Sequence, residues 1–262
     1  MIQDIPKLYT ALAEWLACVL FVRLLPRRYD AAKTAGILAA ALPLFGLVQW
    51  LIGVVPLSLW IPGMIVAWVL MYATIWLCCR VNFCDTGFWW ALAFTLAEFV
   101  ASLEWQLYSF GASKMPGRCW IQGLFLLVFY GGGFGVFLRL EQKRLRDKAP
   151  LHMTRRESIS AAVIAICTFL ISNISYVTTN TPFSGRMTTE IFWIRTLVDF
   201  AGVAVLLSMQ DRWQDMQTQH ELTAIQTLLK RQYEQYRISR DNSEAINRKY
   251  HDLKHQIQVI RM

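Results

Sequence analysis

Charged residues are scarce in this chain. Asp, Glu, Lys and Arg together make up 17% of its 262 residues, whereas 55% are hydrophobic and 11 are Trp. Soluble domains typically carry about 25% charged residues. The composition therefore excludes an ordinary soluble domain of this length and indicates a chain that lies in lipid over much of its surface.

The sequence also lacks a cleavable signal peptide and the cysteine spacings typical of disulfides or metal sites. The N-terminus has no basic stretch followed by a short apolar run and a small-residue cleavage site, so the first apolar segment is expected to stay in the mature protein. The six cysteines show no metal-ligand spacing, and Cys78, Cys79 and Cys84 are expected at the reducing cytoplasmic face. We expect no disulfide and no metal site.

A glycine-rich run at residues 131–135 lacks the Gly-Lys-Ser/Thr that would complete a phosphate-binding loop, and it lies inside an apolar segment. A phosphate loop is therefore excluded. Gly131 and Gly135 have instead the spacing that lets two transmembrane helices approach closely, which predicts a packing site or a kink.

Apolar runs of about 20 residues recur along the first four fifths of the chain, and each is long enough as a helix to cross a hydrocarbon layer of ~30 Å. Backbone polar groups have no water partner in lipid, and continuous apolar runs without alternation exclude a barrel. We predict an all-α fold, a polytopic membrane bundle of about seven transmembrane helices followed by a long cytoplasmic coiled-coil helix. The predicted spans are residues 5–24, 33–54, 57–79, 87–110, 120–140, 158–177 and 191–209.

Lysine and arginine concentrate in the loops after the first and the fifth predicted spans. Short loops rich in these cations face the cytoplasm. We therefore expect a multi-pass plasma-membrane protein with its N-terminus outside, Lys114 outside, Lys148 inside and the tail in the cytoplasm. The net charge of +8 then lies beside anionic lipid and does not indicate a nucleic-acid partner.

Tryptophan gathers near both ends of the predicted spans. Near the outer ends lie Trp50, Trp60, Trp105, Trp120 and Trp193, and near the inner ends lie Trp76, Trp89, Trp90 and Trp213. Aromatic belts of this kind sit at the two membrane interfaces. We expect these side chains to anchor the protein in lipid and not to form a ligand site.

Charged residues also occur inside the predicted spans, where an unpaired charge costs roughly 2.5 kcal/mol or more near the bilayer centre. They are Glu14, Glu98, Glu104, Arg195 and Asp199. Similar predicted depth favours an ion pair between Glu104 and Arg195, with Glu98 and Asp199 deeper. Such residues either tie the fourth and seventh spans together or line a pocket for a polar ligand, and the sequence leaves both possibilities open.

The segment after residue 210 is charged, rich in Gln and free of Pro and Gly. From Leu222 to Ile260, mostly apolar residues recur at alternating spacings of three and four. This spacing is typical of the a and d positions that form the seam of a coiled coil. A charged helix with one apolar stripe needs a second copy, so we predict a parallel homodimer. The seam is polar at Gln232, Ser239 and Ser243. That stretch either shifts register when the membrane part moves or is a local imperfection.

In this heptad frame His251 takes a b position and His255 an f position, so both face outward. The string at residues 250–255 reads YHDLKH, which places a carboxylate directly after an outward imidazole. It resembles the H-box of receptor histidine kinases of the GHKL ATPase group. In particular, it is similar to the AgrC-like peptide-pheromone branch, in which a polytopic sensor precedes a His-Asp-x-x-Asn/His pattern.

The resemblance implies that His251 is the phosphoacceptor, that Asp252 orients its imidazole and accepts a proton, and that His255 occupies the family's Asn/His position. It also implies ATP and Mg²⁺ bound by a catalytic domain, a response regulator and a second copy as partners, and a peptide or other small ligand as signal. The chain ends about three turns after His251 without a glycine-rich nucleotide lid, so we expect a part of a longer kinase that is inactive alone.

This reading divides the chain into a transmembrane sensor at 1–209, a coiled-coil linker at 210–245 and the start of the phosphoacceptor helix at 246–262. A zinc site at His251 and His255 lacks further ligands. The competing functions are a membrane scaffold or adaptor that only dimerises, and a small-solute transporter, for which no internal repeat is present. A retinal protein is disfavoured because the seventh span has no Lys.

Overall fold

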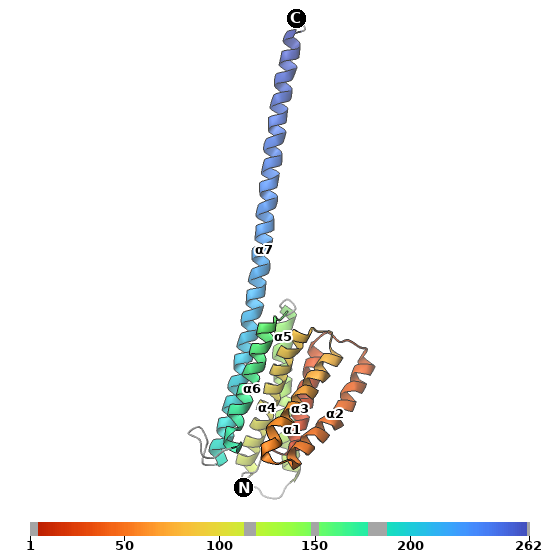
Figure 1. The fold of residues 1–262 in the computed structure, drawn as a ribbon, viewed down its shortest axis with the longest axis vertical. Coiled ribbons are helices and arrows are strands. Elements are labelled where there is room, and N and C mark those ends of the chain that lie inside the picture. The colour runs from red at the N-terminus through yellow and green to blue at the C-terminus, as the bar shows by residue number, and fades with distance from the viewer. Residues whose placement is uncertain (1–4, 113–118, 148–151, 178–187, 261–262) are drawn as a thin grey trace. The chain divides into compact units, whose positions relative to one another are not determined.

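The computed structural model describes residues 5–112, 119–147, 152–177 and 188–260, and every element in these ranges is an α-helix (Figure 1). The helices are α1 (Lys7–Leu24), α2 (Ala31–Val54), α3 (Leu57–Cys78), α4 (Phe83–Ala112), α5 (Cys119–Asp147), α6 (Arg155–Val177) and α7 (Thr188–Ile260). Each predicted span overlaps one of them, so the all-α prediction is confirmed.

Local sequence explains where several helices begin. Pro6 and Pro56 directly precede α1 and α3, where a fixed backbone angle is compatible with helix entry. Glu157 accepts a hydrogen bond from the backbone amide of Thr154 at 2.6 Å, which is half of a capping box at the start of α6. Pro43 lies inside α2, where it removes one backbone hydrogen bond without ending the helix.

Within the described residues, five helices are long and apolar enough to cross a membrane, namely α2, α4, α5, α6 and the part of α7 that begins at Glu190. Two of the seven predicted spans do not meet that standard. Helix α1 has only 18 residues and carries Lys7, Glu14 and Arg23 among them, and the described apolar part of α3 is the shorter Pro62–Cys78. Helix length and composition support the transmembrane character of the chain. They support five of the seven predicted spans.

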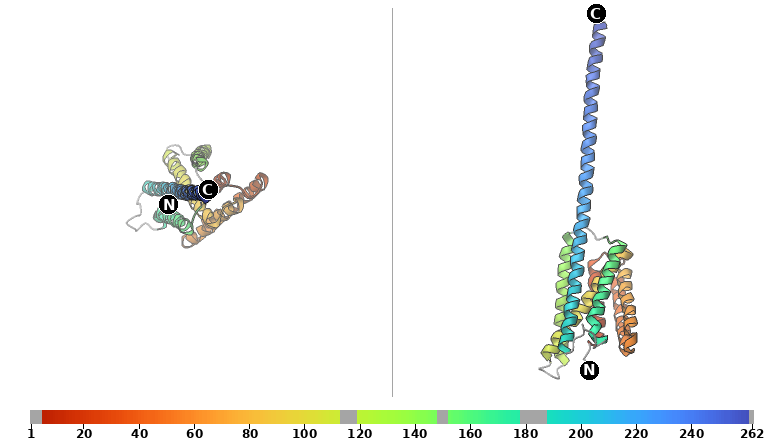
Figure 2. Two further views of the ribbon diagram at one scale, coloured as in Figure 1. Left: turned by 90° about the horizontal axis from the view of Figure 1, so that it is seen from above. Right: turned by 60° about the vertical axis from the view of Figure 1, so that its left-hand side comes forward.

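Helix α4 forms the core of the bundle. Buried residues make up 89% of its most apolar window, against 17% for α2 and for α5, which present most of their surface outward. It contacts α1, α3, α5 and α6, and Figure 2 gives two further views of these helices. Small side chains permit this close packing, because Gly87, Ala91 and Ala97 allow neighbouring backbones to approach.

The connections after α1, α3 and α5 meet at one end of the bundle. The backbone amide of Arg28 donates to the carbonyl of Cys78 at 2.8 Å, which joins the first of these connections to the third helix. The amide of Met153 donates to Asp85 Oδ1 at 2.7 Å, which joins the connection before α6 to the start of α4. The two cation-rich loops therefore lie at the same end, as alternating topology requires.

Cys78 and Cys79 are fully buried at this end. A cysteine buried in this way packs as a small hydrophobic residue and is chemically inert, so we assign both residues that structural role. The five cysteines with described side chains are all free.

Seven of the nine predicted anchor tryptophans are clearly exposed or clearly buried, and Trp60 and Trp213 are half-buried. Exposed side chains, as expected for anchors in the lipid interface, are Trp50, Trp76, Trp120 and Trp193. Trp89, Trp90 and Trp105 are buried between helices instead. The anchoring role predicted for these three is wrong, because position near a helix end does not reveal which side of the helix faces the bundle.

Close helix packing does not occur at the predicted glycines. A methyl group added at Gly131 or Gly135 would meet no atom within 4 Å, so the packing site predicted at these two positions is wrong within the described chain. The alternative, a kink, stays a prediction. Gly133 of the same run does face α4, where an added methyl group would lie 3.2 Å from Val100 Cγ2.

Gly87 of α4, which faces Ser158 of α6, and Gly202 of α7 are the tight positions. A methyl group at Gly202 would lie 2.6 Å from Thr168 Cγ2 of α6 and 3.0 Å from Thr95 Cγ2 of α4.

The chain divides into two compact units, residues 1–211 and 212–262. The second unit is the remainder of α7, and its described side chains from residue 219 to 250 are all exposed, the predicted seam residues Leu222, Leu229 and Tyr236 included. Glu244 makes ion pairs of 3.5 and 3.7 Å with Arg240 and Arg248, which support an isolated helix only weakly. Nothing described within this unit buries the apolar stripe.

Candidate functional site

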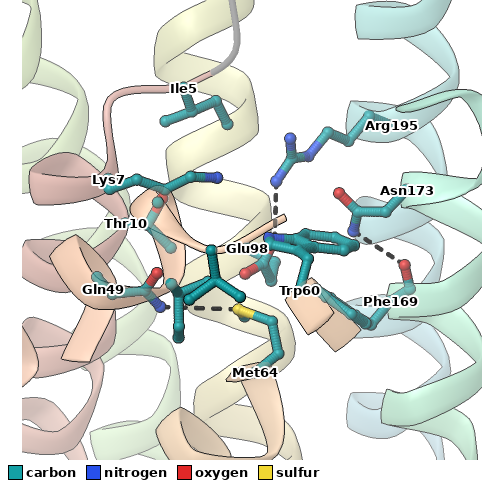
Figure 3. A pocket seen from close by; sticks show the side chains of 13 residues that line it. Ile5, Lys7, Thr10, Gln49, Trp60, Met64, Glu98, Phe169, Asn173 and Arg195 are labelled. Carbon is teal, nitrogen blue, oxygen red and sulfur yellow. Dashed lines mark hydrogen bonds and ion pairs between the residues drawn. The ribbon is translucent and has the colours of Figure 1, made fainter. Parts of the chain in front are cut away.

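A cavity of about 220 Å³ lies within the bundle unit (Figure 3). Side chains from α1, α2, α3, α4, α6 and the first part of α7 line it, together with residues just before α1 and after α2. The cavity combines charged and amide side chains with an apolar wall, the composition typical of small-molecule sites. We therefore take it as the candidate functional site of this unit.

A buried ion pair crosses the site from α4 to α7. Arg195 Nη2 lies 3.0 Å from Glu98 Oε2, and the two side chains are 7% and 4% exposed. The expected pair between Arg195 and Glu104 is wrong. Glu104 is fully buried, but neither of its carboxylate oxygens has a hydrogen-bond partner among the described residues.

Helical phase explains the difference. With about 100° per residue, Ser102 lies about 40° around α4 from Glu98, whereas Glu104 lies about 120° away and faces other helices. The Ser102 hydroxyl donates to Asp199 Oδ2 at 2.9 Å, one turn after Arg195 on α7. Glu98 with Ser102 and Arg195 with Asp199 are thus two pairs at a spacing of four. The spacing of four can be seen in the sequence and places each pair on one face of its helix. Predicted depth alone does not indicate which of Glu98 and Glu104 faces Arg195.

The deep end of the cavity is closed by an amide that sequence reasoning missed. Gln49 Nε2 of α2 donates to Glu14 Oε1 of α1 at 2.7 Å and lies 3.9 Å from Met64 Sδ of α3. Both Gln49 and Glu14 are buried. The hydrogen bond gives the intramembrane carboxylate of Glu14 the partner that its position requires, and it joins the first two helices below the cavity.

An aromatic pair forms one wall. Trp60 of α3 stacks on Phe169 of α6 with ring centroids 5.4 Å apart, and Lys7 Nζ lies 5.8 Å from the centre of the Trp60 ring. Trp60 was expected only to anchor the chain in lipid. Its place in the cavity wall could not be inferred from the sequence, because it depends on how α3 and α6 meet.

A second polar cluster links α5 to α7 at the end of the bundle unit where the cation-rich loops lie. Gln210 Nε2 donates to Glu141 Oε2 at 2.9 Å, and Arg144 bridges Glu141 at 3.4 Å and Asp211 at 3.3 Å. Glu141 is fully buried. The cluster fixes α7 against α5 directly before the tail begins in the sequence.

The predicted phosphoacceptor region belongs to α7, which continues to Ile260. The side chains of His251, Asp252 and His255 lie outside the described part of the chain, so their places are given only by their positions along the helix. Among the residues that are described, no group of three His, Cys, Asp or Glu side chains could hold a metal ion.

Comparisons with known proteins bring no further information. No protein-family model, no curated protein and no solved structure matches the chain. A functional assignment must therefore rest on the residues themselves, that is, on the bundle, its cavity and the string on α7.

Proposed function

We propose that the chain is the sensor part and the phosphoacceptor helix of a receptor histidine kinase in a two-component signalling system. The observation that carries the proposal is the string at residues 250–255, which resembles the GHKL-type H-box and occurs on the helix that also supplies Arg195 to the cavity. Residues that would contact a signal and the residue that would accept phosphate thus belong to one α-helix.

The proposal includes seven membrane spans. The charges of α1 are compatible with a span, because Lys7 and Arg23 lie at its two ends, where long side chains can reach the interface, and Glu14 is hydrogen-bonded to Gln49. Connections after α1 and α3 meet at one end, so α2 and α3 together cross the bundle and return. With the cation-rich loops in the cytoplasm, the N-terminus lies outside and the tail inside.

Signal transfer would use α7 as the moving part. A ligand that alters the contacts of Arg195 with α4 biases the position or rotation of α7, and a change in that helix is passed to the paired tails. In the proposed tail dimer the b position of His251 lies off the seam, where an ATP-bearing domain could reach the imidazole. Asp252 would hold the imidazole in the tautomer whose free nitrogen attacks the γ-phosphorus of ATP. The N–P bond would form as the bond to the leaving oxygen of ADP breaks, and Asp252 would accept the other ring proton.

ATP and Mg²⁺ would be bound by a GHKL-type catalytic domain, and this chain supplies the acceptor. A response regulator would then take the phosphoryl group from His251. The resemblance to the peptide-pheromone branch implies a peptide or other small ligand as the extracellular signal.

Phosphate chemistry tests the proposal against a scaffold that only dimerises. The chain is joined after Met262 to the remaining dimerisation helix and ATP-binding domain of a GHKL-type kinase, reconstituted in bilayers and incubated with labelled ATP. We expect label that is lost in acid and retained in alkali, as a phosphoramidate is. Dimers without such label would favour the scaffold.

A further inference from the structure

Two cationic side chains reach the cavity in the bundle. They are Lys7 and Arg195, and the carboxylate among the described lining residues is Glu98, which lies 3.0 Å from Arg195. Figure 3 shows Lys7 and Arg195 extending toward each other from opposite sides of the space. An anion placed between them would meet donors from both, while Glu98 holds the guanidinium in place.

The remaining wall is apolar and aromatic. Trp60 and Phe169 stack at 5.4 Å, and Met64 and Ile52 complete this side. Flat rings and aliphatic groups bury well against such a surface. The wall therefore fits the apolar body of a ligand whose charged end reaches the two cations.

The cavity is small. Its volume of about 220 Å³ lies below the range of roughly 300–1,000 Å³ that is usual for drug-sized ligands. It lies at the end of the bundle opposite the cation-rich loops, since Lys7 is the first residue of α1 and Gly53 and Val55 lie where α2 ends. A ligand with one ring, one fused ring pair or a short chain suits a cavity of this volume.

We propose that this cavity binds a small monoanion, a carboxylate attached to a compact apolar or aromatic body. The inference rests on the proposed function for its meaning as a signal, but the binding itself does not require kinase activity. Lys7 and Arg195 would hold the carboxylate, Trp60 and Phe169 would cover the apolar body, and the bonded Gln49 would close the deep end.

The test uses the chain in nanodiscs of phosphatidylcholine, a lipid without net charge. Three carboxylates serve as probes, hexanoate, phenylacetate and indole-3-acetate, each paired with its neutral amide. Binding is measured by ligand-observed NMR and by the rise in thermal stability that any ligand of the folded state produces. We expect at least one carboxylate to bind saturably and about tenfold or more tightly than its amide.

Two variants and a matched control locate the site. Lys7→Gln and Arg195→Lys each remove part of the anion contact and should weaken carboxylate binding about tenfold or more, whereas amide binding changes little. Lys33→Gln removes an exposed cation near the other end of α2 and should change neither. Lys7 lies at a helix terminus, so Lys7→Gln should not disturb the fold. It therefore still tests the anion contact if Arg195→Lys destabilises the bundle.

A third arm separates the two sources of such an anion. Repeating the titration with phosphatidylglycerol in the nanodisc shows whether a lipid headgroup competes. Loss of binding there, restored in neutral lipid, would support the anion site with lipid as its occupant. No binding of any carboxylate, equal binding of carboxylate and amide, or unchanged binding in Lys7→Gln would overturn the inference. None of these results bears on phosphorylation of His251.

Discussion

At the scale of single residues, two buried glutamates on α4 differ in whether their carboxylates have partners. Glu98 forms an ion pair with Arg195 at 3.0 Å, whereas the carboxylate oxygens of Glu104 have no hydrogen-bond partner among the described side chains. A buried charge is tolerated when it is paired and is costly when it is not. The two residues should therefore respond differently to replacement.

Breaking the pair should destabilise the bundle. Glu98→Gln leaves the guanidinium of Arg195 buried without its counter-charge, and the expected loss is about 3–5 kcal/mol of unfolding free energy. Thermal unfolding in detergent or nanodiscs measures it as a lower Tm. The double variant Glu98→Gln with Arg195→Gln should lose less than the sum of the two single changes, because the residues interact directly. Strict additivity would show that the pair contributes nothing.

Removing the carboxylate of Glu104 should do no harm. Glu104→Leu keeps the side-chain size and eliminates two unsatisfied oxygens, so the unfolding free energy is expected to stay the same or to rise by about 1–3 kcal/mol. The same thermal unfolding assay gives the comparison with Glu98→Gln. A loss as large as that of Glu98→Gln would mean that Glu104 has a partner that the described structure does not contain.

The list of buried charges could be read from the sequence, but their pairing could not. Residues inside apolar runs are recognised by composition alone, and all five predicted intramembrane charges lie on helices. Which of them meet depends on helical phase and on which faces pack together. Gln49 and Trp60 show the same limit, since an amide and an indole in apolar runs give no sign of lining a cavity.

At the scale of helices, small residues decide how closely neighbours approach. Gly202→Ala should destabilise the bundle by about 1–3 kcal/mol, because the added methyl group would lie 2.6 Å from Thr168 and force α6 and α7 apart. Gly131→Ala is the matched control in α5. It meets open space and should be neutral or stabilise by up to about 1 kcal/mol through helix propensity. Thermal unfolding measures which of the two variants loses more stability. A larger loss of stability in Gly131→Ala than in Gly202→Ala would contradict the prediction.

Helix positions were the most predictable part of the fold. Long apolar runs cannot be anything but helices in lipid, so each predicted span falls on one observed helix. Helix ends were less predictable. Predicted spans stop where hydrophobicity stops, whereas α5 continues through its charged end to Asp147, where Glu141 and Arg144 bind residues of α7. The central place of α4 was not visible either, because hydropathy does not distinguish a helix facing lipid from one surrounded by protein.

At the scale of the whole molecule, we propose that the tail pairs with a second copy. Its apolar stripe is exposed along the described length of the second unit, and a parallel pair would bury it. Cys introduced at Leu229, an a position, should cross-link across the dimer far better than Cys at Glu234, an f position of the same heptad. Equal cross-linking at both positions would remove the coiled-coil argument.

Orientation can be tested with the same chemistry. Lys114, expected outside, and Lys148, expected inside, lie beyond the described part of the chain, but Val55 and Lys33 mark the two ends of α2. A Cys at Val55 should react with an impermeant reagent in intact cells, and a Cys at Lys33 should react only after permeabilisation. The reverse labelling pattern would contradict the predicted orientation and would place the cavity on the cytoplasmic side.

The central claim is that His251 accepts phosphate, and the most direct measurement is acid-labile phosphate in variants of the chain joined to a GHKL-type ATP-binding domain. His251→Gln should abolish the label while dimers still form, because the seam is untouched. His255→Gln, and His220→Gln at an exposed position on the same helix, should keep it. Label that persists in His251→Gln and disappears in His255→Gln, or no acid-labile label in any variant, would contradict the account.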